Sequence, residues 1–199
     1  MLTTPRLTLR QWSRQDRELF AEMNGDPQVM AHYPRTLTRA ESDHLLDLLA
    51  AAIDQHGFGL WAAERRSDGQ LLGFVGLQHV PFEAHYTPAI ELGWRLRRAA
   101  WGCGYATEAA RACASFAFGE LRAGELFAMA RPDNEASLRV MDRLGMRHDP
   151  ADDFRYPPAG QAGSLAYVLY RLSPPPGAGP APGQPDLNAG FAHDRRDLR

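Results

Sequence analysis

Apolar residues recur along the chain with two different periods, and each period predicts a different kind of element. Residues 6–12 (RLTLRQW) alternate between apolar and polar side chains, which is the pattern of a half-buried strand. Residues 38–57 hold their apolar side chains at helical spacing, so that one face of a helix is apolar. That stripe consists of Leu45, Leu48, Leu49, Ala52 and Ile53.

Polar caps and glycines predict where the helices begin and end. Ser13 is placed to cap a first helix, and Gly25 ends it. Thr38 with Glu41 three residues later forms a capping box for the second helix. Gly57 follows the apolar stripe and is expected to end that helix.

The remaining pattern predicts a mixed sheet covered by helices. Ser67, Asp68 and Gly69 predict a tight turn between strands over 58–65 and 71–80. Further strands are predicted over 89–96, 125–131 and 164–172, with a short one near Met146, and further helices over 105–121 and 134–144. This order predicts an α+β fold with three layers (α/β three-layer). A mixed central sheet of about seven strands is flanked by about four helices.

Length and composition predict one globular domain followed by a tail. The chain has 199 residues, 44% of them hydrophobic and 23% charged, which is enough to build one core. We expect the domain to span residues 1–172. Residues 173–199 hold six prolines and four glycines and offer little to bury, so we expect a disordered Pro/Gly-rich tail.

Charge and cysteine content exclude several classes of function. With 22 Lys and Arg against 24 Asp and Glu, the net charge of −2 argues against nucleic-acid binding through a basic face. No apolar run approaches the ~20 residues of a membrane span, and Met1 begins no signal peptide, so we expect a cytoplasmic protein. Two cysteines and scattered histidines predict neither a disulfide framework nor a metal site. Monomer and homodimer both remain open.

The most informative stretch runs from the strand over 89–96 into the helix that begins near Tyr105. Gly102 and Gly104 lie in the turn between them. Backbone N–H groups at a helix start have no partner within the helix, the helix dipole is positive there, and glycine lets an anion approach closely. The pattern therefore predicts an anion cradle.

Three interpretations of this loop compete. A Rossmann dinucleotide site would need a small residue where Thr107 stands and an acid that ends a strand ~20 positions later. Glu125 lies near that distance but begins its strand, which argues against this interpretation. The second interpretation is a tight corner without a ligand. The third depends on the rest of the chain.

The segment WGCGYATEA, from Trp101 to Ala109, resembles the acyl-CoA motif of the GNAT N-acetyltransferase superfamily. The Gly104 and Ala106 positions match the end of its [QR]-x-x-G-x-[GA] form. Trp101 departs from the Gln or Arg of the broad motif but matches the RimJ/RimL-type branch. Four further segments resemble that branch in family order over residues 3–172: TPRLTLR, DPQVM, GFVGL and the helix that begins at Asn134 and ends in LGM.

The resemblance implies the GNAT acyl-CoA N-acyltransferase fold and transfer of acetyl from acetyl-CoA to a primary amine, without a metal. The cradle would hold the CoA pyrophosphate, and the strand before it would pair with the pantetheine arm. Arg97 and Arg98 would add positive charge, unless solvation at the surface explains them. The implied acetyl-CoA residues are Trp94, Arg95, Leu96, Trp101, Gly102, Cys103, Gly104, Tyr105, Ala106, Thr107 and Asn134. Asn134 has a second interpretation as a plain helix N-cap.

Catalysis requires a base that deprotonates the amine and a group that stabilises the leaving thiolate. Glu91 is the candidate base, because apolar neighbours could raise its pKa; the alternative is a carboxylate on the solvent face of its strand. The resemblance implies that a backbone N–H in the range from Leu92 to Trp94 would stabilise the oxyanion. Many family members carry a Tyr seven residues after the Asn, where this chain has Met141, so Ser137 is the candidate that resembles the RimL-type branch. Its alternative role is that of an ordinary N3 residue.

The acceptor amine is predicted with the least information. In such folds the first two helices and the loop before the fourth strand form the wall of the acceptor groove. The substrate-facing candidates are Asn24, His32, Tyr33, Trp61, Phe82 and Tyr86. A protein N-terminal α-amine is the first expectation, and a small-molecule amine such as an aminoglycoside or polyamine is the second. A CoA-binding regulator without turnover is the third.

Overall fold

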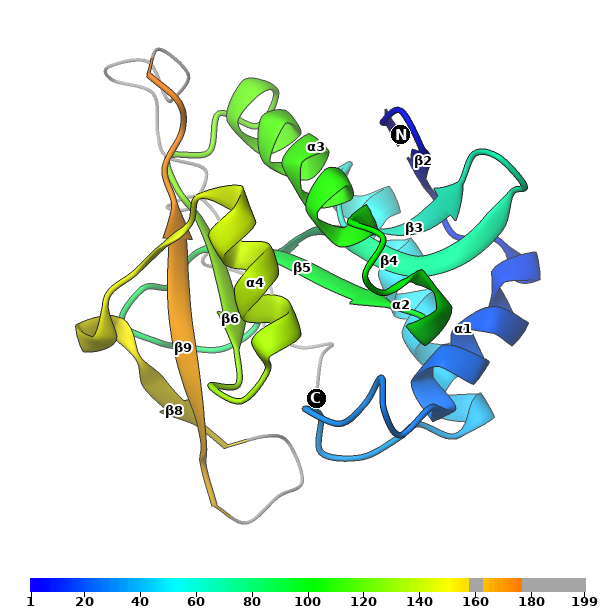
Figure 1. The fold of residues 1–199 in the computed structure, drawn as a ribbon, viewed down its shortest axis with the longest axis horizontal. Coiled ribbons are helices and arrows are strands. Elements are labelled where there is room, and N and C mark those ends of the chain that lie inside the picture. Colours follow the sequence, from blue (N-terminus) through cyan, green and yellow to red (C-terminus); the bar gives the residue numbers. More distant parts are fainter. Residues whose placement is uncertain (158–162, 177–199) are drawn as a thin grey trace. The chain divides into compact units, whose positions relative to one another are not determined.

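The computed structural model describes residues 1–157 and 163–176 of the chain, and Figure 1 shows their fold. The described strands are β1 (Leu2–Thr3), β2 (Leu7–Arg10), β3 (Leu60–Arg65), β4 (Gln70–His79), β5 (Ile90–Leu96), β6 (Leu126–Ala130), β7 (Arg147–His148), β8 (Phe154–Tyr156) and β9 (Leu165–Leu172). The α-helices are α1 (Arg17–Gly25), α2 (Arg39–His56), α3 (Tyr105–Gly119) and α4 (Glu135–Leu144), and the short 3-10 helices are η1 (Arg14–Asp16), η2 (Arg98–Ala100) and η3 (Pro150–Asp152).

The chain divides into two compact units. Unit 1 consists of Met1–Leu77 and Gly93–Cys113, and unit 2 consists of Gln78–Leu92 and Ala114–Arg199. The boundaries fall inside β4, β5 and α3, so each of these elements contributes residues to both units.

In unit 1 the strands pair in the order β1-β2-β3-β4-β5. The first three pairings are antiparallel, with Leu7 opposite Arg65 and Leu60 opposite Gly76. The register shifts by one residue after Ala63, which marks a bulge in the β3–β4 pair. Leu7 and Leu9 are fully buried on β2, as the alternation predicts, although β2 is shorter than the predicted strand.

Helices α1 and α2 pack against each other in unit 1 (Figure 1). The Thr38 side chain accepts a hydrogen bond from the Glu41 N–H, and the Glu41 carboxylate accepts one from the Thr38 N–H, so the predicted capping box is confirmed. Gly57 ends α2 in the left-handed conformation, also as predicted. The start of the first helix differs from the prediction, because the Ser13 cap is followed by the 3-10 turn η1 before α1 begins.

Unit 2 is built around β9. This strand pairs antiparallel with β6, β7 and β8, while β5 and β6 pair in parallel with Glu91 opposite Phe127. Helix α4 packs against β6 (Figure 1). A core of buried Tyr86, Ala89, Phe127 and Leu169 lies in this unit.

The fold class is therefore as predicted: a mixed, open sheet with four α-helices in the described residues. Nine strands are described where about seven were expected. The two additional strands are β1 and β8, and two or three residues are too few for a periodic pattern to show. Of the predicted tail, residues 177–199 lie outside the described part of the chain. None of the helices described is long and apolar enough to cross a membrane.

Candidate active site

The connection from β5 to α3 is held by its own hydrogen bonds. The indole Nε1 of Trp101 donates to the Leu96 carbonyl at 2.8 Å, and the Trp101 N–H donates to the Arg98 carbonyl at 3.1 Å. Trp101 is 46% exposed, so its ring covers the end of β5 without entering the core. The residue that departs from the broad acyl-CoA motif thus fixes the path of the loop.

Two glycines then turn the chain into α3. Gly102 and Gly104 have φ of 73° and 79°, the left-handed region where a Cβ is strained. The Glu108 N–H donates to the Gly104 carbonyl at 3.0 Å, which is the first bond of the helix ladder. The N–H groups before it, from Gly104 to Thr107, have no partner within the helix, and they lie at its positive end.

The Thr107 side chain adds a polar group to this helix start. Thr107 is 6% exposed, and its buried Oγ1 has no hydrogen-bond partner among the described residues. A buried hydroxyl without a partner is uncommon, because it loses its bonds to water without replacement. A phosphate oxygen at the helix start would supply the missing bond, so the residues present fit a pyrophosphate.

The two cysteines differ in their surroundings. Cys103 is exposed between the glycines, and its Sγ lies 3.5 Å from the Trp101 carbonyl oxygen. Cys113 is fully buried in α3, and its burial raises the pKa of the thiol well above the ordinary range. Cys113 is therefore an inert core residue.

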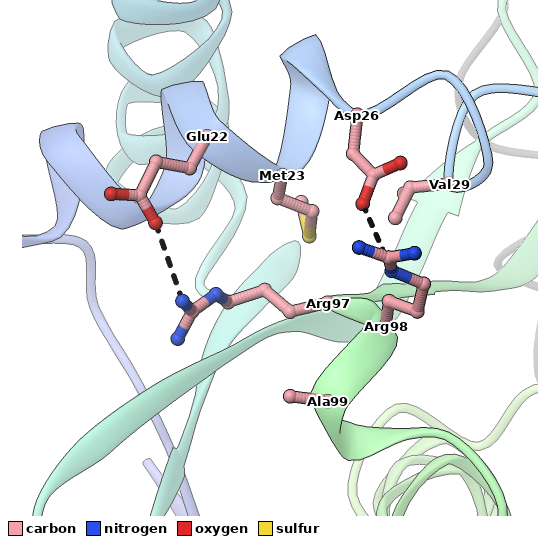
Figure 2. A pocket seen from close by; sticks show the side chains of 7 residues that line it. All are labelled: Glu22, Met23, Asp26, Val29, Arg97, Arg98 and Ala99. Atoms are coloured by element: carbon pink, nitrogen blue, oxygen red, sulfur yellow. Dashed lines mark hydrogen bonds and ion pairs between the residues drawn. The ribbon is translucent and has the colours of Figure 1, made fainter.

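A cavity of about 340 Å³ lies beside the residues that lead into the loop (Figure 2). It is lined by Arg97, which lies between β5 and η2, and by Arg98, the first residue of η2. Arg97 pairs with Glu22 at 3.3 Å and Arg98 pairs with Asp26 at 3.4 Å, with the Met23 side chain between the two ion pairs. Both arginines expected to add charge to the cradle are therefore engaged with carboxylates of unit 1.

The candidate base Glu91 is half-buried on β5 in unit 2. Desolvation raises the pKa of its carboxyl to about 7, although a hydrogen bond from Gln78 lowers it somewhat. The Gln78 Nε2 donates to Glu91 Oε2 at 2.7 Å. Glu91 is therefore not a freely solvated surface carboxylate, and it titrates in the range that suits a general base at neutral pH.

Two substrate-facing candidates lie in an aromatic cluster of unit 2. Tyr86 is 8% exposed, its ring centroid lies 5.2 Å from that of Phe127, and its Oη lies 3.9 Å from the Met129 Sδ. Burial, with the Glu91 charge as a smaller cause, raises the pKa of Tyr86 above its ordinary value. Phe82 is half-buried and stacks on Tyr156 with 4.1 Å between centroids.

Three other candidates meet in unit 1. Arg95 Nη1 donates to the Oδ1 of fully buried Asn24 at 2.7 Å, and the Arg95 guanidinium lies 4.0 Å from the centre of the Tyr33 ring. Asn24 in turn donates to Ser42 Oγ at 2.9 Å. The structure brings Asn24, Tyr33 and Arg95 together as a packed network.

The last two substrate-facing candidates lie elsewhere in unit 1. Trp61 is 2% exposed on β3, so its ring belongs to the packed interior of the unit. His32 is half-buried in the segment after α1, next to Tyr33 in the chain. The burial of Trp61 favours a packing role over contact with an acceptor.

Asn134 and Ser137 lie at the start of α4 in unit 2. Asn134 Oδ1 accepts a hydrogen bond from the Ser137 N–H at 3.1 Å, so Asn134 is the N-cap of this helix. Both residues are half-buried, and Met141 one turn later is 1% exposed. The cap occupies the Asn134 oxygen and leaves its amide nitrogen for another role.

Sequence reasoning missed three residues around these groups. Gln78 could have been found from the sequence, because it ends the apolar run 71–77 with a side chain that can donate a hydrogen bond. Arg6 and Glu108 were inside segments that resemble the family, but the pattern assigned them no role. They form an ion pair at 2.6 Å across more than a hundred residues of chain.

Comparison with known proteins decides the family. The family model described as the acetyltransferase (GNAT) domain matches residues 6–147. The chain belongs to the GNAT acetyltransferases. The resemblance that began at Trp101 is thereby confirmed. Among the residues described, no group of three or more His, Cys, Asp or Glu side chains is placed to hold a metal ion.

Two relatives and one solved structure are similar to this GNAT acetyltransferase over most of their length. The YkkB protein of Bacillus subtilis (strain 168) is 34% identical over 74% of this chain and 85% of its own length. The FsC-acetyl coenzyme A-N(2)-transacetylase of Aspergillus fumigatus is 31% identical over 85% of this chain and 76% of its own length. The structure of Mycobacterium smegmatis RimJ in complex with CoA-disulfide has a TM-score of 0.67 at 18% identity, over 84% of this chain and 81% of that one.

Proposed function

We propose that this GNAT acetyltransferase is of RimJ/RimL type and transfers acetyl from acetyl-CoA to the α-amine of a protein N-terminus. The observation that carries the proposal is the half-buried Glu91 carboxyl with a pKa near 7, on the strand that leads into the glycine loop. A base of that pKa matches an α-amine, because the two groups titrate within about one pKa unit of each other.

The glycine loop supports acetyl-CoA as the donor. The N–H groups from Gly102 to Thr107 would bind the pyrophosphate, and the Thr107 hydroxyl would gain a partner. Hydrogen bonds to a charged acceptor contribute about 1.5–3 kcal/mol each. Relatives support the same donor, since one is named for acetyl coenzyme A and a structural neighbour was solved with CoA-disulfide.

Strand β5 supports the position of the pantetheine arm. Within the described residues it pairs in parallel with β6 where Glu91 lies opposite Phe127. The backbone groups of Trp94, Arg95 and Leu96 follow that pair along the strand, and they would form strand-like hydrogen bonds with the arm.

The amine must lose a proton before it attacks. At pH 7 deprotonation costs about 1 kcal/mol for an α-amine of pKa ~7.7–8.0 but about 4.6 kcal/mol for a lysine of pKa ~10.4. Glu91 accepts the proton with little driving force in either direction for the α-amine. The lysine would leave a much larger gap between donor and acceptor pKa values, which is why the α-amine is favoured.

The reaction is completed when the CoA thiolate leaves and its sulfur is stabilised by a hydrogen bond. The amine nitrogen forms a bond to the acetyl carbon, the carbon–sulfur bond breaks, and the thiolate leaves with the electron pair. A thiol of pKa ~8.5 leaves readily as the thiolate. Ser137 is the proposed source of a hydrogen bond to this sulfur, since Met141 has no acidic proton to give.

A small-molecule amine is the second candidate acceptor. It is favoured by the relative from Aspergillus fumigatus, whose name specifies acetyl transfer at an N(2) nitrogen. The alkyl amines of a polyamine are chemically like that of lysine and more basic than an α-amine, so they fit the Glu91 pKa less well. The third candidate, a CoA-binding regulator, predicts binding without turnover.

The test is release of free CoA thiol over a panel of acceptors at pH 7. The panel contains peptides with free and blocked N-termini, peptides with one lysine, spermidine and an aminoglycoside. We expect turnover with the free N-terminal peptides alone and retention of activity when lysine is blocked. Turnover with small amines only would show that the acceptor is a small molecule and not a protein N-terminus. Tight acetyl-CoA binding without turnover on any acceptor would contradict the proposed transfer reaction.

A further inference from the structure

Arg6 lies beside the glycine loop and contacts Cys103 and Tyr105, the residues on either side of Gly104. Its Nη1 donates to the Cys103 carbonyl at 3.0 Å, and its guanidinium carbon lies 4.6 Å from the centre of the Tyr105 ring. A Cβ placed on Gly104 would lie 3.6 Å from the Arg6 Nη2. The side chain therefore lies against the loop from Cys103 to Tyr105, where it restricts the positions that the loop can take.

The same arginine pairs with Glu108 one turn into α3. Its Nε donates to Glu108 Oε2 at 2.6 Å and its backbone N–H donates to Oε1 at 2.9 Å, while the Thr4 hydroxyl donates to Oε1 at 2.6 Å. Partial burial raises the pKa of the Glu108 carboxyl, but these hydrogen bonds outweigh it and the net shift is downward. Glu108 is thus a charged carboxylate at neutral pH.

A carboxylate at this position has opposite effects on the helix and on an anionic ligand. In the first turn it interacts favourably with the positive end of the helix dipole. Unpaired, it would also repel a pyrophosphate bound at the same helix start, because like charges a few ångströms apart interact strongly where water is partly excluded. Pairing with Arg6 cancels that repulsion and keeps the loop and helix start in one arrangement.

We propose that Arg6 and Glu108 are positioning residues for CoA binding: the pair presents the N–H groups of the glycine loop to the pyrophosphate without contacting the ligand itself. This inference rests on the proposed acetyl-CoA site. According to this inference, the affinity for the phosphate part of the donor depends on the contact between Arg6 in the N-terminal segment and Glu108 in α3. The pantetheine part of the donor does not depend on the pair.

The experiment compares two ligands by titration calorimetry, CoA and pantetheine, which lacks the pyrophosphate. We expect Arg6→Met and Glu108→Gln each to raise the Kd of CoA about tenfold, or about 1.4 kcal/mol, and to leave the Kd of pantetheine unchanged. The double variant should be no weaker than the weaker single variant, because the two residues act as one unit. Arg6→Lys, which keeps the charge but not the fork of donors, should restore part of the affinity.

Arg66→Met is the matched control. Arg66 donates to the Thr4 and Pro5 carbonyls at 3.1 and 3.2 Å, so it anchors the same N-terminal segment with the same kind of side chain but away from the loop. It should bind CoA like the wild type. Melting temperatures of all variants show whether a loss reflects the fold, in which case both ligands would weaken together and the inference would fail.

Two further outcomes are decisive. If Glu108→Gln binds CoA as tightly as the wild type while Arg6→Met does not, Arg6 contacts the phosphate directly and the positioning role is wrong. If the wild type binds CoA and all variants bind it equally, the pair has no role in binding while the proposed donor site stands. A wild type that does not bind CoA would remove the proposed donor site itself.

Discussion

The amide of Gln78 donates a 2.7 Å hydrogen bond to the carboxylate of Glu91, and this is the bond that keeps a half-buried acid usable as a base. Burial favours the protonated form of Glu91, and the bond from Gln78 favours the charged form. The balance leaves the pKa at about 7. Glu91 is therefore part charged and part neutral at neutral pH, and it responds to small changes around it.

Replacing Glu91 with Gln should remove the base and keep the shape of the site. We expect kcat to fall by about 10²–10⁴-fold, the range typical of general base catalysis, while the Kd of acetyl-CoA stays near that of the wild type. In the wild type, kcat/KM should rise with pH up to about 7 as Glu91 loses its proton, and the variant should lose this inflection. Equal kcat values for wild type and variant would remove Glu91 from the mechanism.

Replacing Gln78 with Met should move that inflection to higher pH. Methionine has a similar length but donates no hydrogen bond, so the charged form of Glu91 loses its support and its pKa rises further above 7. The pH profile of kcat/KM measures the shift. Gln70→Met, at the other end of β4 beside Arg65, is the control and should leave the profile in place; an unchanged profile for both variants would contradict the role of Gln78.

The raised Glu91 pKa also predicts how stability depends on pH. Because the folded pKa of about 7 exceeds the ordinary 4.5, the folded state holds a proton that the unfolded state has lost between these values. The contribution to the free energy of unfolding is full below about pH 4.5 and is lost as pH rises to about 7. At 1.36 kcal/mol per pKa unit the loss is about 3 kcal/mol. Urea unfolding of wild type and Glu91→Gln at pH 5 and 8 should show this loss in the wild type only.

Several of these relationships could be predicted from the sequence, and others could not. The capping box of Thr38 and Glu41 was predictable because all its partners lie within one turn of helix. The glycine loop was predictable because its geometry depends on a few adjacent residues. By contrast, the Gln78–Glu91 bond requires the register between β4 and β5, and the loop of residues 80–89 between them carries no pattern that fixes it.

Contacts between residues far apart in the sequence were the features that the sequence patterns predicted least. Arg6 and Glu108 meet because the start of β2 and the start of α3 are both part of unit 1, and no local period reveals which side chain each will face. Strand β8 was missed for a related reason: Phe154 to Tyr156 is a strand only because β9 provides its partner. Its three residues are too few to show an alternation of their own.

An alanine at Gly102 should disturb the loop by its backbone alone. With φ of 73° and no atom within 4 Å of an added Cβ, the cost is strain in the left-handed region, about 1–2 kcal/mol. We expect a lower melting temperature and weaker CoA binding. Gly119→Ala, at the last residue of α3 and equally free of neighbours, is the control and should be neutral or slightly stabilising; equal effects from both would show that conformation at Gly102 is unimportant.

Removing residues 173–199 should leave the melting temperature and the acetyl-CoA KM unchanged. At the first residue of this segment, Arg147 donates an exposed hydrogen bond to Ser173 Oγ at 3.3 Å, which contributes little. A fall of several degrees on truncation after Leu172 would show that the segment contributes to folding.

The buried hydroxyl of Thr107 is expected to lower the stability of the free protein and to strengthen the binding of CoA. Valine has the same shape and no hydroxyl, so Thr107→Val would remove a buried polar group that lacks a partner in the described residues. A screen for heat resistance run without CoA would therefore favour valine, while a screen for turnover at low acetyl-CoA would favour threonine. Selection that retained threonine here would be selection for the ligand.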